Sequence, residues 1–139
     1  MKQADLGYVA GIIDGEGSIH IVRRKEPTTR RGYKYELQIS VGNTQEWLIR
    51  WLHFNFGGYM HVCKAPKKGN RDCWHWSIRT RDAVDFLKLL LPYLKLKRPQ
   101  AELALQFQGN KKMHGHKTDE EWAVEEAQTI LMHNFNTGL

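Results

Sequence analysis

The sequence predicts an α+β domain in which one antiparallel sheet carries its helices on a single face. Apolar residues recur with a helical period in some segments and with a period of two in others, and the segments follow the order helix, two strands, helix, two strands, helices. With 139 residues, 41% of them hydrophobic, the chain suits one packed domain and is too short for two ordinary ones. We expect a single domain over residues 1–139, with a core at about 1–110 and an acidic helix at about 118–136.

The first predicted helix covers residues 3–14. Its apolar residues are too continuous for a helix with one wet side, so we expect burial nearly all round. Gly7 and Gly11 lie one turn apart with Ala10 beside them, although glycine costs about 1 kcal/mol relative to alanine inside a helix. Close approach of another helix would explain these small residues. Gly15 and Gly17 are expected to end the helix.

The middle of the chain predicts two strand pairs around a helix. Residues 18–24 and 33–41 alternate between apolar and polar side chains and are joined by a polar loop. Asn43 is the expected N-cap of a helix over about 44–56. The apolar stripe of that helix would comprise Trp47, Leu48, Trp51 and Leu52. Further strands are predicted at 59–64 and 71–79 around a basic loop, and further helices at 81–92, at 99–107 and after a capping box of Thr118 and Glu121.

Composition excludes several classes of protein. No apolar run approaches the roughly 20 residues that span a bilayer, and the first residues lack the features of a signal peptide. Two cysteines cannot build a disulfide framework, which favours a reducing compartment. We therefore expect an intracellular protein with no membrane association and no targeting signal, encoded by a bacterium, an archaeon or a phage, or within an organelle.

The charge is unevenly divided along the chain. Residues 118–139 hold five acidic side chains and no Lys or Arg, whereas the other 117 residues carry 21 basic and 10 acidic side chains, a balance of +11. This balance favours a polyanionic partner, nucleic acid first, although many basic proteins bind none.

The polar side chains of the strands define a candidate nucleic-acid surface. Amides, hydroxyls, imidazoles and guanidiniums can read base edges in a DNA major groove, and an antiparallel ribbon fits there. A merely solvated sheet face is the alternative. The candidate DNA contacts are the strand residues Ser18, His20, Val22, Arg24, Lys34, Glu36, Gln38, Ser40, His61, Cys63, His75 and Ser77, with the loop residues Arg30, Arg31, Lys64, Lys67, Lys68 and Arg71.

Asp14 and Glu16 place two carboxylates at the C-terminal end of the first helix. The helix dipole is negative there, and Lys or Arg is the usual occupant. Carboxylate and carbonyl oxygens suit Mg²⁺, which also binds phosphate. A divalent cation is therefore one interpretation of this pair, and a turn cap or a pairing with a distant arginine is the other.

Residues 8–18, YVAGIIDGEGS, resemble the signature of the LAGLIDADG homing endonucleases, with residues 9–17 in the register of its nine letters. The order of segments up to about residue 110 and the stretch 92–101, similar to the one that carries the family's active-site lysine, extend the resemblance. The acidic last helix has no clear counterpart. The resemblance implies the αββαββα LAGLIDADG homing endonuclease fold, whose four-stranded antiparallel sheet forms a saddle over the DNA major groove.

The resemblance also implies the site. Glu16 would be the metal ligand, with the carbonyl of Gly15, and Lys97 would lie near the scissile phosphate. Asn43 matches a polar residue that organises active-site waters, and Asp14 matches a supporting residue. Mg²⁺ is the expected cofactor, and Mn²⁺ or Ca²⁺ could occupy the same site. The family usually has Asp where this chain has Glu16, whose longer side chain changes its reach to the metal.

A homodimer follows from the resemblance, because the chain holds one motif and supplies one acid. Gly7, Ala10 and Gly11 would face the motif helix of the second copy, and the DNA target would be long and pseudo-palindromic. The implied function is metal-dependent phosphodiester hydrolysis by a site-specific double-strand DNA endonuclease of a mobile intron or intein-like element. A maturase that binds its host intron RNA and a non-cleaving DNA-binding regulator are the alternatives, and Glu16 with Lys97 argues against the regulator.

His61, Cys63, Cys73 and His75 lie on the second predicted strand pair, where all four side chains could share one face. Zn²⁺ binding, DNA contact and a Cys63–Cys73 disulfide in an oxidising compartment are open alternatives. The spacing lacks the usual zinc knuckles, which favours DNA contact.

Overall fold

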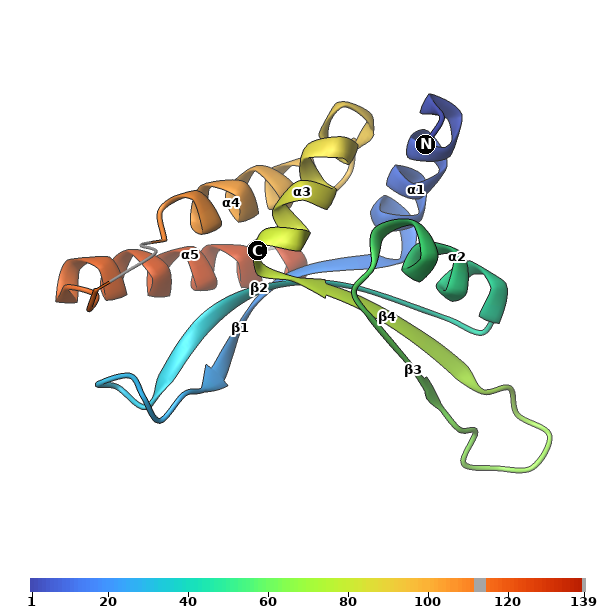
Figure 1. Ribbon diagram of the computed structural model, residues 1–139, viewed down its shortest axis with the longest axis horizontal. Helices are drawn as coiled ribbons and strands as arrows, with labels where there is room; N and C mark the ends of the chain where they lie inside the picture. Colours follow the sequence, from blue (N-terminus) through green and yellow to red (C-terminus); the bar gives the residue numbers. More distant parts are fainter. Residues whose placement is uncertain (112–114, 139) are drawn as a thin grey trace.

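In the computed structural model, which describes residues 1–111 and 115–138, one antiparallel sheet of four strands carries five α-helices and a short 3₁₀ helix. The helices lie on one side of the sheet (Figure 1), which confirms the predicted α+β arrangement. In chain order the elements are α1 (Gln3–Glu16), β1 (Gly17–Lys25), β2 (Tyr33–Asn43), α2 (Glu46–Phe56), β3 (Tyr59–Cys63), β4 (Cys73–Arg79), α3 (Thr80–Leu90), η1 (Leu91–Tyr93), α4 (Arg98–Gly109) and α5 (Asp119–Thr137).

The sheet has the strand order β1-β2-β4-β3, so its two hairpins meet through β2 and β4. All three strand pairs are antiparallel, and Ser18, Ser40 and Ser77 occupy one row across them. The hairpins diverge from this centre and leave a concave underside opposite the helices (Figure 1). This saddle presents the polar face of the sheet to solvent.

The core lies between the sheet and the helices. Alternate residues of the strands point toward the helices, as the period of two predicts. The largest side chains that are less than 2% exposed include Ile19, Leu37, Ile39 and Trp76 from the sheet, and Ile13, Ile49, Leu52, Phe86, Leu87, Leu90 and Phe107 from the helices. The indole N–H of Trp76 donates to the carbonyl of Gly57 at 2.7 Å, so the one polar atom of this ring has a partner.

Helix α1 runs two residues past its predicted end, and β1 follows without a loop. This sharp transition needs glycine at position 17, since a Cβ there would lie 2.8 Å from Ile13 Cα. The expectation that α1 is buried nearly all round is wrong for a single chain: Val9, Ala10 and Ile13 are buried, whereas Tyr8 is 47% exposed.

Helix α2 begins at Glu46, and its buried stripe is Leu48, Ile49 and Leu52. Trp47, expected in the stripe, is 57% exposed. The prediction of Asn43 as the N-cap is also corrected, because Gln45 occupies that position and Asn43 ends β2. The later start of the helix explains the different N-cap, and the packing of Leu48, Ile49 and Leu52 against the core turns Trp47 toward solvent.

Helix α5 lies beside β1 (Figure 1). Its capping box of Thr118 and Glu121 is confirmed. Trp122 and Met132 belong to the core, and near the C-terminus Asn136 donates from Nδ2 to the carbonyl of Ile19 at 2.9 Å. In residues 1–111 and 115–138, no helix combines the length and the apolar character needed to cross a bilayer.

Candidate functional site

Glu16, the last residue of α1, has an exposed side chain. Asn43 donates from Nδ2 to Glu16 Oε2 at 2.7 Å, and Asn43 Oδ1 accepts from the backbone N–H of Gln45 at 2.8 Å. Among the described residues, the amide is the partner of Glu16 and no cation forms a salt bridge with it. The negative charge of this carboxylate is therefore available to a cation.

Asp14 joins the end of α1 to the segment that precedes α4. Its carboxylate accepts the backbone N–H groups of Lys95 at 2.9 Å, Leu96 at 3.2 Å and Lys97 at 2.9 Å. Burial raises the pKa of the Asp14 carboxyl, but the hydrogen bonds from Lys97, Lys95 and Leu96 outweigh burial, and the pKa lies below its usual value of 3.8. Asp14 is therefore ionised and fully engaged with backbone.

Lys97 is held at the same helix end as Glu16. Its Nζ atom donates to the carbonyl of Asp14 at 2.8 Å. The N–H of Gly17 donates to the carbonyls of Ile12 and Ile13, and the Asp14 carbonyl accepts from Lys97. The Gly15 carbonyl follows these along the chain, directly before Glu16. The last turn of a helix lacks intrahelical partners for its carbonyls. The structure thus brings together Asp14, Gly15, Glu16, Asn43 and Lys97 from three segments of the chain.

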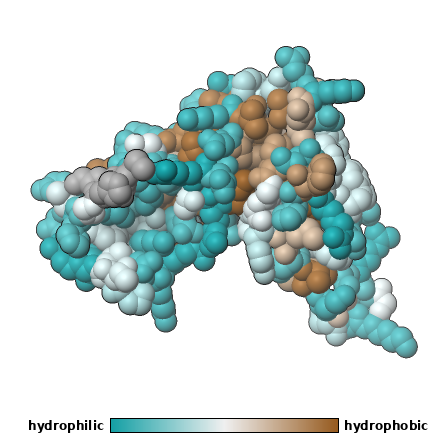
Figure 2. All heavy atoms as spheres, viewed as in Figure 1, coloured by the Kyte–Doolittle hydropathy of each residue, from teal (hydrophilic) through white to brown (hydrophobic). Residues whose placement is uncertain are grey.

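One face of α1 is open. Cβ atoms added at Gly7, Gly11 and Gly15, spaced one turn apart, would meet nothing within 4 Å. Ala10, predicted at a dimer interface, is instead 0% exposed and packs in the core of its own chain. The surface available to a second helix therefore follows the glycines. Figure 2 shows hydrophobic atoms where α1 and α3 lie next to each other.

The strand residues predicted to contact DNA alternate with the core residues of the strands, so they share the face of the sheet opposite the helices. The register pairs Ser18 with Ser40 and His20 with Gln38, and the same alternation continues into β4 and β3. Burial lowers the pKa of His20 from its usual 6.5, so the imidazole is neutral at pH 7 and offers one donor and one acceptor. The twelve predicted strand residues are Ser18, His20, Val22, Arg24, Lys34, Glu36, Gln38, Ser40, His61, Cys63, His75 and Ser77.

Glu36 is enclosed by cations on this face. Its carboxylate lies 2.8 Å from Arg24 Nε, 3.5 Å from Arg79 Nη1 and 3.7 Å from Lys34 Nζ, and the residue is 7% exposed. Arg24 also donates to Gln38 Oε1 at 3.3 Å. Glu36 therefore neutralises and orients the basic side chains, which corrects the expectation that it contacts DNA itself.

The two hairpin loops differ. Arg30 Nη2 and Arg31 Nη2 lie 2.6 and 3.4 Å from Asp119 Oδ1, and the Arg31 guanidinium stacks on the ring of Trp122. These two predicted DNA contacts are thus paired with α5, a helix whose position the sequence does not reveal. In the second hairpin, Lys64 Nζ lies 3.3 Å from Asp72 Oδ2. The other predicted cations of that hairpin, Lys67, Lys68 and Arg71, are exposed.

His61, Cys63 and His75 come together on the polar face. One ligand atom from each side chain lies within 4.8 Å of the others. Cys73 pairs with Cys63 in the strand register and is not part of this trio, and both thiols are free. The cross-strand disulfide, one of the alternatives that the sequence left open, is not formed in this structure.

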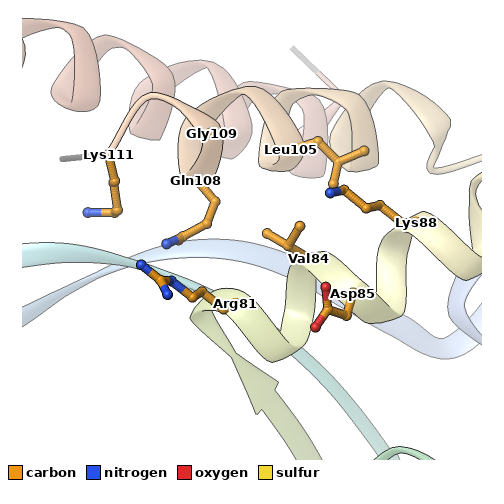
Figure 3. A pocket seen from close by; sticks show the side chains of 8 residues that line it. All are labelled: Arg81, Val84, Asp85, Lys88, Leu105, Gln108, Gly109 and Lys111. Atoms are coloured by element: carbon orange, nitrogen blue, oxygen red, sulfur yellow. The ribbon is translucent and has the colours of Figure 1, made fainter. Parts of the chain in front are cut away.

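The groove between α3 and α4 contains none of the predicted site residues (Figure 3). Its lining mixes cations, an acid and aliphatic groups: Arg81, Val84, Asp85, Lys88, Leu105, Gln108, Gly109 and Lys111. The candidate chemistry therefore lies at the end of α1 and on the sheet.

Three site residues were missed in the sequence. Tyr59 stacks on His61 with ring centroids 5.7 Å apart, and Arg79 reaches Glu36. The alternation of polar and apolar residues along the strands places Tyr59 and Arg79 on the polar face, so the sequence could have identified these two residues. Tyr8, beside the open glycine face, contacts Trp51 edge-on at 5.8 Å, and only the tertiary structure reveals that pair.

No protein-family model matches the chain. The DNA endonuclease I-CreI of Chlamydomonas reinhardtii is 30% identical over 99 residues, which cover 71% of this chain. The aligned region spans 59% of the length of that relative.

Solved structures share the fold. The homing endonuclease I-CvuI, solved in complex with its target in the presence of Ca, aligns with a TM-score of 0.78 and 21% identity over 96% of this chain and 82% of that chain. The homing endonuclease I-TnaI aligns with a TM-score of 0.71 and 20% identity over 91% of this chain and 86% of that chain. At these identities the likeness establishes the arrangement of helices and strands.

Proposed function

Since this chain belongs to the LAGLIDADG homing endonuclease family, we propose that it is a site-specific endonuclease that hydrolyses both strands of duplex DNA as a homodimer. The observation that carries the proposal is the exposed carboxylate of Glu16 at the end of α1, beside Lys97 and next to an open helix face. I-CreI is itself a DNA endonuclease, and I-CvuI was solved on DNA.

The donor set fits a divalent cation, and Mg²⁺ is the one we propose. Glu16 supplies an anionic oxygen without a basic partner among the described residues, and Gly15 supplies a neighbouring carbonyl. Hard oxygen donors of this kind suit Mg²⁺, which retains water and binds phosphate. When bound there, the cation would activate a water and stabilise the leaving 3′-oxygen.

The residues of the chain would then act in fixed roles. Asn43 orients the Glu16 carboxylate through its 2.7 Å hydrogen bond. Lys97 offsets the negative charge that develops on the scissile phosphate. Asp14 is a positioning residue, because its three backbone hydrogen bonds place the segment that carries Lys97.

Cleavage of both strands requires a second Glu16. The glycine face of α1 would pack against the same face of another copy, since an isologous contact places the two motif ends side by side. The two saddles would then form one long concave surface for a pseudo-palindromic duplex. Neutral His20 and the cations around Glu36 would contact bases and phosphates along it.

Cleavage of a randomised duplex library in Mg²⁺ tests the proposal. We expect the unaltered protein to cut both strands, and Glu16→Gln to bind the selected duplex but cut it more than about 100-fold more slowly. Glu120→Gln on α5 is the matched control and should cut normally. Equal cutting by Glu16→Gln would refute the assigned metal ligand, whereas binding without cutting by the unaltered protein would favour the regulator.

A further inference from the structure

A second candidate metal site lies on the polar face of the sheet, built from residues other than those at Glu16. His61 and His75 are direct partners in the register of β3 and β4, and Cys63 follows His61 by two residues on the same side of β3. His61 and Cys63 of β3 and His75 of β4 thus present their side chains on the same side of the sheet. Their ligand atoms lie within 4.8 Å of one another.

The two imidazoles are already aligned. Their ring centroids are 5.0 Å apart and the ring planes differ by 12°. The His75 ring lies over Gly42 of β2, where a Cβ would come within 3.0 Å of Cε1 and 3.1 Å of Nδ1. Glycine at position 42 therefore makes room for the imidazole, and a larger residue there would displace it.

We propose that His61, Cys63 and His75 bind a thiophilic divalent ion, Zn²⁺ in the first place. Imidazole nitrogens and a thiolate are the ligands that zinc prefers, at about 2.0–2.1 Å and 2.3 Å. In a tetrahedral site such ligands lie roughly 3.3–3.6 Å apart. Since all three atoms lie within 4.8 Å of one another, no pair has to approach by more than about 1.5 Å. His61 and Cys63 are exposed and can rotate into place. Three protein ligands leave the fourth position to water.

Binding exchanges a proton for the metal. The thiol of Cys63 loses its proton to solvent and both imidazoles bind through neutral nitrogens. The dication plus one thiolate adds one positive charge to the face that the proposed function assigns to DNA. Mg²⁺ does not compete effectively for this site, because it prefers oxygen ligands.

Cobalt is a spectroscopic probe of the site. Metal-free protein is titrated with Co²⁺ in excess Mg²⁺, which occupies hard oxygen sites. We expect one equivalent of Co²⁺ per chain to produce a thiolate-to-cobalt charge-transfer band and intense tetrahedral ligand-field bands, and one equivalent of Zn²⁺ to abolish both. Absence of these bands in the unaltered protein overturns the proposal.

The variants identify the ligands. Cys63→Ser should lose the charge-transfer band, and His61→Ala should weaken Co²⁺ binding by more than about tenfold. Cys73→Ser removes the neighbouring thiol and should keep the band, as should Glu16→Gln, which separates this site from the nuclease site. A band that survives Cys63→Ser, or disappears in Cys73→Ser, overturns the assignment. Circular dichroism verifies that each variant is folded.

Discussion

Asp14 shows how one side chain serves both the fold and the site. Asp14 lies two residues before the end of α1, yet its carboxylate accepts hydrogen bonds from residues more than 80 positions away in the sequence. The carboxylate acts as an anion at the start of α4, where the backbone N–H groups have no helical partners. Because Lys97 returns a hydrogen bond to the Asp14 carbonyl, loss of Asp14 would affect both stability and the position of Lys97.

We expect Asp14→Ala to lower the free energy of unfolding by about 1–2 kcal/mol, as the loss of a helix cap does. The lowered pKa of Asp14 means that its stabilisation is complete above 3.8 and is lost as the pH falls through the lowered value. In urea denaturation, the unfolding free energies of the unaltered protein and of Asp14→Ala should therefore differ at neutral pH and become equal in strong acid. Asp85→Ala, on the exposed side of α3, is the control. An undiminished difference in acid would contradict this role.

The roles of α1 and α5 follow from what each whole helix contacts. Helix α1 buries Val9, Ala10 and Ile13 and leaves the glycine face open. Helix α5 brings its acids to the basic part of the chain: Asp119 pairs with Arg30 and Arg31, and Glu125 accepts from the Nζ atoms of two lysines. The acidic helix therefore neutralises cations of its own chain.

Gly11→Leu tests the open face of α1. A Cβ at position 11 meets nothing within 4 Å in a single chain, and leucine is a better helix former than glycine, so the monomer should gain up to about 1 kcal/mol of stability. A proposed dimer whose helices touch at this position should dissociate. Sedimentation compares this variant with Ala123→Leu, which adds an exposed leucine to α5. A dimer that persists in Gly11→Leu would contradict the packing.

Glu125→Gln tests the docking of α5. Glu125 is 6% exposed and lies 3.0 Å from Lys111 Nζ and from Lys117 Nζ. Burial lowers the pKa of Lys111 and nearby Glu125 opposes that change, so removal of the acid leaves a poorly solvated cation. We expect a loss of about 3 kcal/mol in urea denaturation. Exposed Glu126→Gln should cost far less, and an equal cost would show that Glu125 is not the anchor.

At the scale of the whole molecule, charge and curvature combine. Figure 2 shows hydrophilic atoms at the far ends of both hairpins, and Figure 1 shows that these hairpins flank a concave underside. The first hairpin is tied to α5, whereas Lys67, Lys68 and Arg71 extend into solvent from the second. Electrostatic attraction to DNA should therefore depend most on the second hairpin.

The salt dependence of DNA binding measures this asymmetry. The affinity should fall steeply with salt, and Lys67→Ala with Lys68→Ala should make the logarithmic slope shallower by about 2 per chain if both contact phosphates. Arg81→Ala with Lys88→Ala, in the groove of Figure 3, removes two cations on the helix side and should leave the slope unchanged. Fluorescence anisotropy provides the slopes. Equal slopes for the two double variants would contradict the assigned DNA face.

The sequence by itself determined the order of helices and strands, the polar face of the sheet and the acids at the end of α1, because each follows from local periodicity or a short motif. Only the tertiary structure decided which residues meet: Asp14 with the backbone of Lys97, Asn43 with Glu16, and Arg30 and Arg31 with Asp119. It also placed Ala10 in the core and Trp47 at the surface. Periodicity assigns a side chain to a face, but hydrogen bonds and ion pairs between segments 27 to 89 residues apart depend on how the elements pack in space.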